Sequence, residues 1–165
     1  MPLTVIDEPL DRPLWIAETI HLVAAMMERR RGDLLALVAT AADADLSRGS
    51  DDRWGLGQVA THLLIVERGV AAIVLHLALG EAVGATGQPR PDAATVSRDG
   101  IAALASRAEA GLRRLREGFP AAPRLDTTAP HPYYGDLNCF GWLLTLGNHY
   151  TAHLSSLRDG TPSAL

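Results

Sequence analysis

The sequence predicts an all-α fold, a four-helix bundle, and three observations indicate this class. Four segments of roughly 20 or more residues repeat apolar side chains every three to four positions, as an α-helix with one buried face does. No segment alternates apolar and polar residues in the way a half-buried strand does. Ala and Leu are plentiful while aromatic residues make up 5% of the chain, a composition that favours helix. Long helices without strands bury their apolar faces by packing as a bundle.

The first predicted helix begins at Pro13, whose ring suits the first helical turn, and runs to about Ala42. Apolar residues follow at helical spacing along it, and Gly32 is a place where it can bend. The charged run 28–31 within this helix is interpreted as a solvated face. The polar, turn-rich residues 43–53 predict a loop.

The second predicted helix spans residues 55–79 and ends at Gly80. A continuous apolar stripe runs along it, formed by Val59, Leu63, Val66, Val70, Ile73 and Leu77. His62 lies about 60° from the centre of this stripe, within the face that the helix turns inward. His76 lies roughly 100° away, close to where solvent or a neighbouring helix begins. The Gly- and Pro-rich residues 80–93 predict a second loop.

The third predicted helix spans residues 95–118 and has one apolar and one charged face, as a surface helix does. The Pro-rich residues 119–135 predict a third loop. Asp136 is a suitable N-cap for the fourth helix, which runs to about Arg158 before Gly160 ends it. All three loops are longer than a minimal bundle needs, so at least one is expected to be a crossover connection or a lid over a site.

Composition and charge restrict the classes of function. The 165 residues suit one domain, to which we assign residues 1–165. A net charge of −4 argues against nucleic-acid binding as the main activity. The lone Cys139 excludes an internal disulfide and favours a reducing compartment. The N-terminus lacks a signal-peptide pattern, and no apolar run approaches the roughly 20 residues of a membrane span. We therefore expect a cytoplasmic protein that binds no nucleic acid and no membrane.

Two histidines, His149 and His153, stand four residues apart on the fourth predicted helix. Positions i and i+4 lie on one helix face, so both imidazoles share the apolar stripe of Trp142 and Leu146. An unpaired buried polar group costs about 1–3 kcal/mol, so these imidazoles are hydrogen-bonded within the core or bound to a shared metal ion, unless the helix is rotated so that they are exposed.

His62 is the best-placed third ligand. It lies early in its helix whereas His149 and His153 lie past the middle of theirs, so antiparallel or crossed packing brings the three together. Three histidines leave a coordination position open, as catalytic zinc sites do. A closed structural site would need a fourth protein ligand, and the sequence indicates none.

Three short motifs carry a family resemblance. They are W-x-x-x-x-V-x-x-H-L from Trp54 to Leu63, H-P-x-x-G followed by W from His131 to Trp142, and H-x-x-x-H-L from His149. Their order resembles the DinB/YfiT-like superfamily of metal-dependent bundles. The resemblance implies a four-helix bundle with a crossed connection, a homodimer, and a divalent metal, zinc or nickel. By position the implied ligands are His62, His149 and His153.

The resemblance also implies several chemistries, among them hydrolases, S-transferases that use a low-molecular-weight thiol, and a maleylpyruvate isomerase. Our leading hypothesis is an enzyme whose metal activates water or such a thiol to attack a small electrophilic substrate. The alternatives are a non-catalytic metal- or ligand-binding bundle with a stress-related or regulatory role, and a purely structural helical dimer.

Further residues are candidates for the surroundings of this site. Trp54, Trp142, Tyr133 and Tyr134 are expected at the pocket, with packing in the core or in the loop as the alternative.

Glu18, His21 and His131 are expected behind the ligands, where they would orient them. Glu18 and His21 can equally form a surface pair, and His131 can instead serve the turn before Pro132. The histidine pair encloses Tyr-Thr-Ala and so offers no carboxylate as a base. A base would come from Glu18 or Glu67, or be unnecessary because zinc lowers the pKa of bound water.

Overall fold

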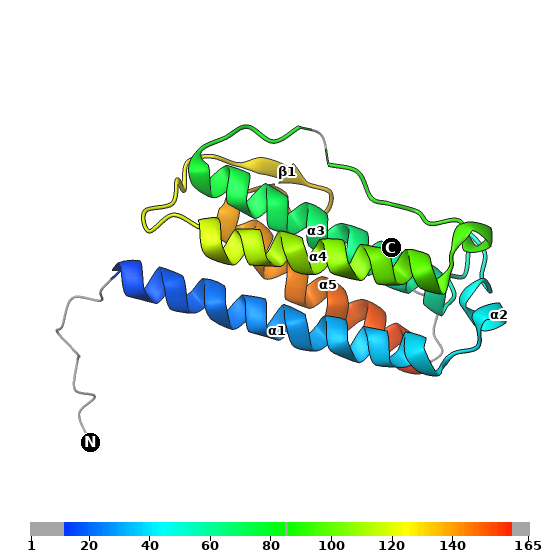
Figure 1. Ribbon diagram of the computed structural model, residues 1–165. Helices are drawn as coiled ribbons and strands as arrows, with labels where there is room; N and C mark the ends of the chain where they lie inside the picture. Colours follow the sequence, from blue (N-terminus) through cyan, green and yellow to red (C-terminus); the bar gives the residue numbers. More distant parts are fainter. Residues whose placement is uncertain (1–11, 85, 160–165) are drawn as a thin grey trace, which may run out of the picture.

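The computed structural model describes residues 12–84 and 86–159, and four long helices dominate this part of the chain (Figure 1). They are α1 (Arg12–Thr40), α3 (Leu56–Leu79), α4 (Arg98–Gly118) and α5 (Cys139–Asp159). The shorter elements are the helical turns α2 (Asp43–Leu46) and η1 (Ala93–Thr95) and the strands β1 (Ala129–His131) and β2 (Gly135–Leu137). The predicted four-helix class is confirmed. α1 continues as a helix through Gly32.

The helices pack as two parallel pairs. In α3 and α4, Arg68 lies against Gly111 and Leu75 against Gly118, so the two helices run in the same direction. A parallel neighbour requires a long return, and the segment 80–97 runs the length of the bundle to provide it (Figure 1). The expected crossover connection is therefore this second loop. α1 and α5 form the other parallel pair (Figure 1).

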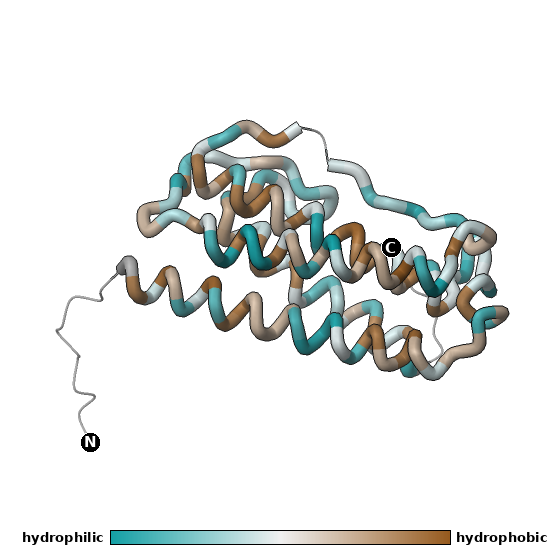
Figure 2. Tube along the Cα trace, in the orientation of Figure 1, coloured by the Kyte–Doolittle hydropathy of each residue, from teal (hydrophilic) through white to brown (hydrophobic). Residues whose placement is uncertain are grey.

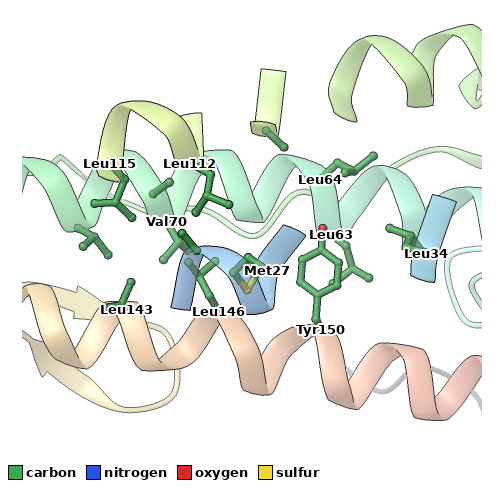
Figure 3. Close-up of a cluster of buried hydrophobic side chains, with 14 of the residues drawn as sticks. Met27, Leu34, Leu63, Leu64, Val70, Leu112, Leu115, Leu143, Leu146 and Tyr150 are labelled. Carbon is green, nitrogen blue, oxygen red and sulfur yellow. The ribbon is translucent and has the colours of Figure 1, made fainter. Parts of the chain in front are cut away.

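α3 and α5 are antiparallel, as the convergence of the histidines requires. His62 lies beside His153, and Glu67, further along α3, bonds Tyr150, which precedes His153 on α5. The side chains between these helices and their neighbours form one buried core (Figure 3). Its labelled members come from α1 (Met27, Leu34), α3 (Leu63, Leu64, Val70), α4 (Leu112, Leu115) and α5 (Leu143, Leu146, Tyr150).

α3 is the most apolar helix of the bundle, and brown apolar segments recur along it (Figure 2). By length and composition alone, Leu56–Leu79 is long and apolar enough to cross a membrane. Half of its most apolar window is buried inside the protein. The core helix of a bundle contacts neighbours on several sides and needs this composition, so the packing explains it.

Two predicted loops contain short helical turns. Residues 43–53 begin with α2, whose Leu46 is buried, and residues 80–93 lead into η1. α4 starts at Arg98, three residues later than predicted, because Ser97 is its N-cap. The Ser97 hydroxyl accepts a hydrogen bond from the Gly100 amide at 3.1 Å.

The third loop contains an antiparallel ribbon that the sequence pattern did not predict. Ala129 pairs with Leu137 and His131 with Gly135, whose φ of 72° is the left-handed geometry that glycine adopts easily. Strands of three residues are too short to show alternation.

The predicted cap of the last helix was wrong, because Asp136 lies within β2. Asn138 caps α5 instead, and its Oδ1 accepts the Gly141 amide at 3.1 Å. Asp and Asn are about equally good N-caps, so composition alone does not choose between them.

Candidate metal centre

The structure brings together His62 from α3 and His149 and His153 from α5. One ring nitrogen of each lies within 4.8 Å of the others, close enough for the group to hold a metal ion. The Nε2 atoms of His62 and His149 are 2.8 Å apart. His62 and His153 are buried and His149 is half-buried. The predicted i, i+4 geometry of α5 thus places both of its imidazoles beside the helix that carries the third.

A backbone carbonyl orients His62. Its Nδ1 lies 2.7 Å from the carbonyl oxygen of Pro89, which can only accept, so Nδ1 donates and Nε2 keeps its lone pair toward His149. Such a partner fixes the tautomer that a metal ligand needs. Sequence reasoning missed this contact, since a carbonyl in a Gly- and Pro-rich loop carries no side-chain signature.

Gln58 holds that loop against α3. It is fully buried one turn before His62, and its Nε2 donates to the Pro91 carbonyl at 3.0 Å. Its Oε1 accepts the Gly55 amide at 3.1 Å, which also satisfies the first turn of α3. Two side chains one turn apart therefore attach the same loop, through Pro89 and Pro91.

All three histidines favour the neutral state. Burial lowers the pKa of His62, although the Pro89 carbonyl partly opposes this. Burial, together with the neighbouring histidines, lowers the pKa of His149 to about 3 and that of His153 to about 4. At neutral pH the three imidazoles are uncharged, which is the protonation state in which histidine binds metal ions.

Trp54 packs against the histidines. Its ring is nearly parallel to that of His153, with centroids 6.3 Å apart and an interplanar angle of 9°. It meets His62 edge-on at 4.9 Å. Trp54 is buried and is not among the residues that line the adjoining cavity. Of the two places predicted for Trp54, pocket wall or core, the structure shows the core, where the ring supports two imidazoles.

A cavity of about 500 Å³ adjoins the centre. His62 and His149 form part of its wall, whereas His153 and Trp54 do not line it. The remaining wall comes from α3, the 86–89 segment, the ribbon and α5. Trp142, Tyr133 and Tyr134 lie on this wall, the two tyrosines with more than half of their surface exposed.

The ribbon is attached to α5 through aromatic side chains. Trp142 Nε1 donates to the Ala129 carbonyl at 3.1 Å, and the His131 ring lies 4.7 Å from that of Trp142 and 4.8 Å from that of Tyr134. The Nδ1 atom of His131 accepts the Tyr133 amide at 3.2 Å. His131 thus shapes the turn and lines the cavity, and it is not part of the convergent three-histidine group.

The structure does not bring Glu18 and His21 to the histidines. Both are exposed on α1, where they line a separate surface hollow with Ala17 and Leu22. Their spacing predicted that they adjoin each other, but it does not determine which way that face of α1 points. Ile16, Ile20, Ala24 and Met27 occupy the core-facing side of the helix instead.

Glu67, the other candidate base, is occupied elsewhere. It is fully buried between Arg31 of α1, with which it forms an ion pair, and Tyr150 of α5, whose hydroxyl donates to it at 2.6 Å. Burial raises the pKa of Glu67, and the bonds from Tyr150 and Arg31 oppose the rise. The interpretation of 28–31 as a solvated face was therefore wrong at Arg31, which is buried. Glu67 does not line the cavity.

The fold and the site define a class of helical bundle in which three histidines converge on a position able to hold a metal ion. The sequence profile of the DinB superfamily matches residues 26–157, which include all three histidines, and the chain belongs to this superfamily. The structure is similar to the crystal structure of TT2238, a four-helix bundle protein, with a TM-score of 0.62 and 28% identity over 85% of this chain and 98% of that one. Comparison with curated proteins finds no match.

Proposed function

We propose that this protein is a metal-dependent enzyme in which His62, His149 and His153 hold one divalent ion, zinc or nickel. In this proposal the ion activates water or a low-molecular-weight thiol toward a small electrophilic substrate. The observation that carries the proposal is the pairing of three neutral, convergent imidazoles with a cavity that reaches two of them. Histidine nitrogens suit both metals, and three ligands leave room for an exogenous one.

The protein's own groups perform distinct tasks in this proposal. The Pro89 carbonyl holds His62 in the tautomer whose Nε2 is unprotonated, and Trp54 fixes the rings of His62 and His153 by packing. When bound, a divalent ion lowers the pKa of a water or thiol ligand toward neutrality and so supplies a nucleophile. No Asp or Glu is among the described residues that line the cavity, which is why we assign no carboxylate base.

The lack of Asp and Glu among the described residues of the wall also favours the second candidate, a non-catalytic bundle that binds a metal or a ligand. Without a carboxylate among the described residues of the wall, the cavity can serve as a binding site alone. Turnover distinguishes the two. A metal-loaded protein that converts none of a panel of esters, epoxides and haloarenes, with and without thiol, would support the binding function.

Metal content is the first test. Untagged protein is purified without added metal, and its zinc and nickel are measured by elemental analysis for wild type and His149→Ala. We expect about one equivalent per chain in wild type and a loss of most of it in the variant, since two remaining histidines bind far more weakly.

His21→Ala is the matched control, because it removes an exposed histidine of α1 that lies outside the group. It is expected to keep the full metal content. Wild-type protein that is metal-free and also fails to take up added Zn²⁺ or Ni²⁺ would overturn the proposed function.

The nucleophile is identified by thiol dependence. An S-transferase consumes an electrophile only when thiol is present, and the product carries the sulfur. A hydrolase proceeds without thiol. A homodimer and a cytoplasmic location remain predictions of this proposal, and light scattering coupled to size-exclusion chromatography measures the first.

A further inference from the structure

Among the described residues that line the cavity, only the histidines can carry a formal charge near neutral pH. Twenty of the described residues line it, and none of these is Arg, Asp or Glu. Charged residues make up 21% of the chain, so a wall of this size drawn at random would include about four. Away from the position of the proposed metal ion, a charged group bound there would lose hydration without gaining an ionic partner, which is costly.

Apolar and aromatic side chains form most of the wall. Along α3 the stripe of Ile65, Val66, Val70 and Ile73 faces the cavity, and the aromatic rings of the ribbon and α5 line other parts of its wall. A volume of about 500 Å³ falls within the usual range of small-molecule pockets.

The polar groups of the wall are neutral, and several already have partners. The Thr145 hydroxyl donates to the Trp142 carbonyl at 2.7 Å, and that of Thr86 donates to the Pro130 carbonyl at 3.2 Å. Gln88 accepts from the Tyr133 hydroxyl at 3.3 Å, which leaves its amide hydrogens as donors. The wall therefore suits the apolar part of a ligand and offers a few neutral hydrogen-bonding groups.

Gly69 leaves a space in this wall. It lines the cavity from α3, and a β-carbon at this position would meet no heavy atom within 4 Å. A glycine inside a helix is unfavourable by about 1 kcal/mol relative to alanine. A β-carbon therefore fits at this position without strain, and a longer side chain extending from it would take up cavity volume.

We propose that this cavity binds an uncharged ligand with an apolar or aromatic body, and that the empty space at Gly69 determines how large that body can be. The placement of the ligand's reactive end at His62 and His149 rests on the proposed function. The substrate would then be a neutral ester, epoxide or haloarene, and compounds of the same shape with an anionic group on the part that contacts the apolar wall would bind more weakly.

Two fluorescent probes of nearly the same shape test the charge preference. N-phenyl-1-naphthylamine is neutral, and 8-anilino-1-naphthalenesulfonate is the same ring system with a sulfonate. The probes are measured with protein as purified and after metal removal; the neutral probe is expected to bind saturably at one site, and in the metal-free protein the sulfonate is expected to bind weaker by about tenfold or more. Equal affinity for the two probes would overturn the inference.

Gly69→Trp tests the location. It is expected to weaken binding of the neutral probe by about tenfold or more, whereas the matched control Gly69→Ala changes it by less than about twofold. Gly69→Leu is the second variant, and its loss of probe affinity is expected to lie between those of Gly69→Ala and Gly69→Trp. The melting temperature and metal content of all three variants are measured to check that the fold is intact. Unchanged binding in folded Gly69→Trp would overturn the inference.

The outcomes also separate this inference from the proposed function. Protein that takes up no metal, even when Zn²⁺ or Ni²⁺ is added, but binds the probe and responds to Gly69 as expected would support the cavity and refute the metal centre. Protein that takes up metal but binds both probes alike after metal removal would refute the cavity preference and leave the metal centre standing.

Discussion

The buried ion pair between Arg31 and Glu67 makes a strong prediction for stability. The Arg31 side chain is 8% exposed and that of Glu67 is fully buried, so the carboxylate depends on Arg31 and Tyr150 for its solvation. Removing one partner of a buried pair costs about 3–5 kcal/mol. Arg31→Met keeps most of the packing volume and leaves the Tyr150 bond, so we expect the lower end, about 3 kcal/mol.

The pH dependence of this loss identifies its cause. Burial raises the folded-state pKa of Glu67 above its ordinary value of 4.5. A carboxyl of this kind contributes stability that is fully present below the unfolded pKa and is lost as the pH rises through the folded pKa. Without Arg31 the folded pKa rises further. The decrease in the free energy of unfolding caused by Arg31→Met is therefore expected to be larger at pH 8 than at pH 5.5.

Denaturant and thermal unfolding, followed by circular dichroism at both pH values and in one fixed metal state, measure the effect. For a domain of this size, about 3 kcal/mol corresponds to a decrease in Tm of roughly 6–12 °C. Arg29→Met is the matched control, because Arg29 is exposed two residues away, and it is expected to change stability by less than about 0.5 kcal/mol.

A double variant separates the charge from the packing. Arg31→Met combined with Glu67→Gln removes both charges and is expected to recover a large part of the loss, since no unpaired ion remains buried. A difference between wild type and Arg31→Met that is the same at pH 5.5 and pH 8, or that is below about 1 kcal/mol, would refute the reasoning.

Two further predictions concern glycines and caps. Gly57→Ala is expected to cost about 2–3 kcal/mol, because a β-carbon there would overlap the Leu46 carbonyl oxygen and lie 2.6 Å from Val96 Cγ1. Gly32→Ala, in open space on α1, is expected to stabilise the protein by about 0.5–1 kcal/mol. Urea unfolding measures both variants, and equal effects of Gly57→Ala and Gly32→Ala would contradict the close packing described at Gly57. Asn138→Ala should lower stability by about 1 kcal/mol through loss of the α5 cap, while Asp136→Ala should be nearly neutral. A larger loss of stability for Asp136→Ala than for Asn138→Ala would indicate that Asp136 is the cap.

Much of the fold follows from the sequence because helices depend on neighbours within a turn or two along the chain. The periodic apolar positions predicted all four long helices, and the ends of α3 were within a residue of those observed. The shared face of His149 and His153 was equally local, since any α-helix places i and i+4 together. The third histidine could be anticipated because it lay on the inward arc of its own helix.

The tertiary structure alone decided which groups meet across the chain. The bond from His62 to Pro89 joins positions 27 apart, and the approach of His62 to His149 joins positions 87 apart. No periodicity encodes such pairs, because they depend on how each helix is rotated about its axis and on where a loop returns.

The same limit explains the residues that were misplaced. Arg31, Glu18 and His21 all lie on α1, and its rotation buries the first and exposes the other two. The sequence left Glu67 as a candidate base, whereas in the fold its carboxylate bonds Arg31 and Tyr150, which lie 36 and 83 residues away along the chain. The sequence by itself determined the helices and the donor atoms of the site. The packing of α1, α3 and α5 decided which of those atoms converge, because a side chain's role depends on the groups that surround it in space.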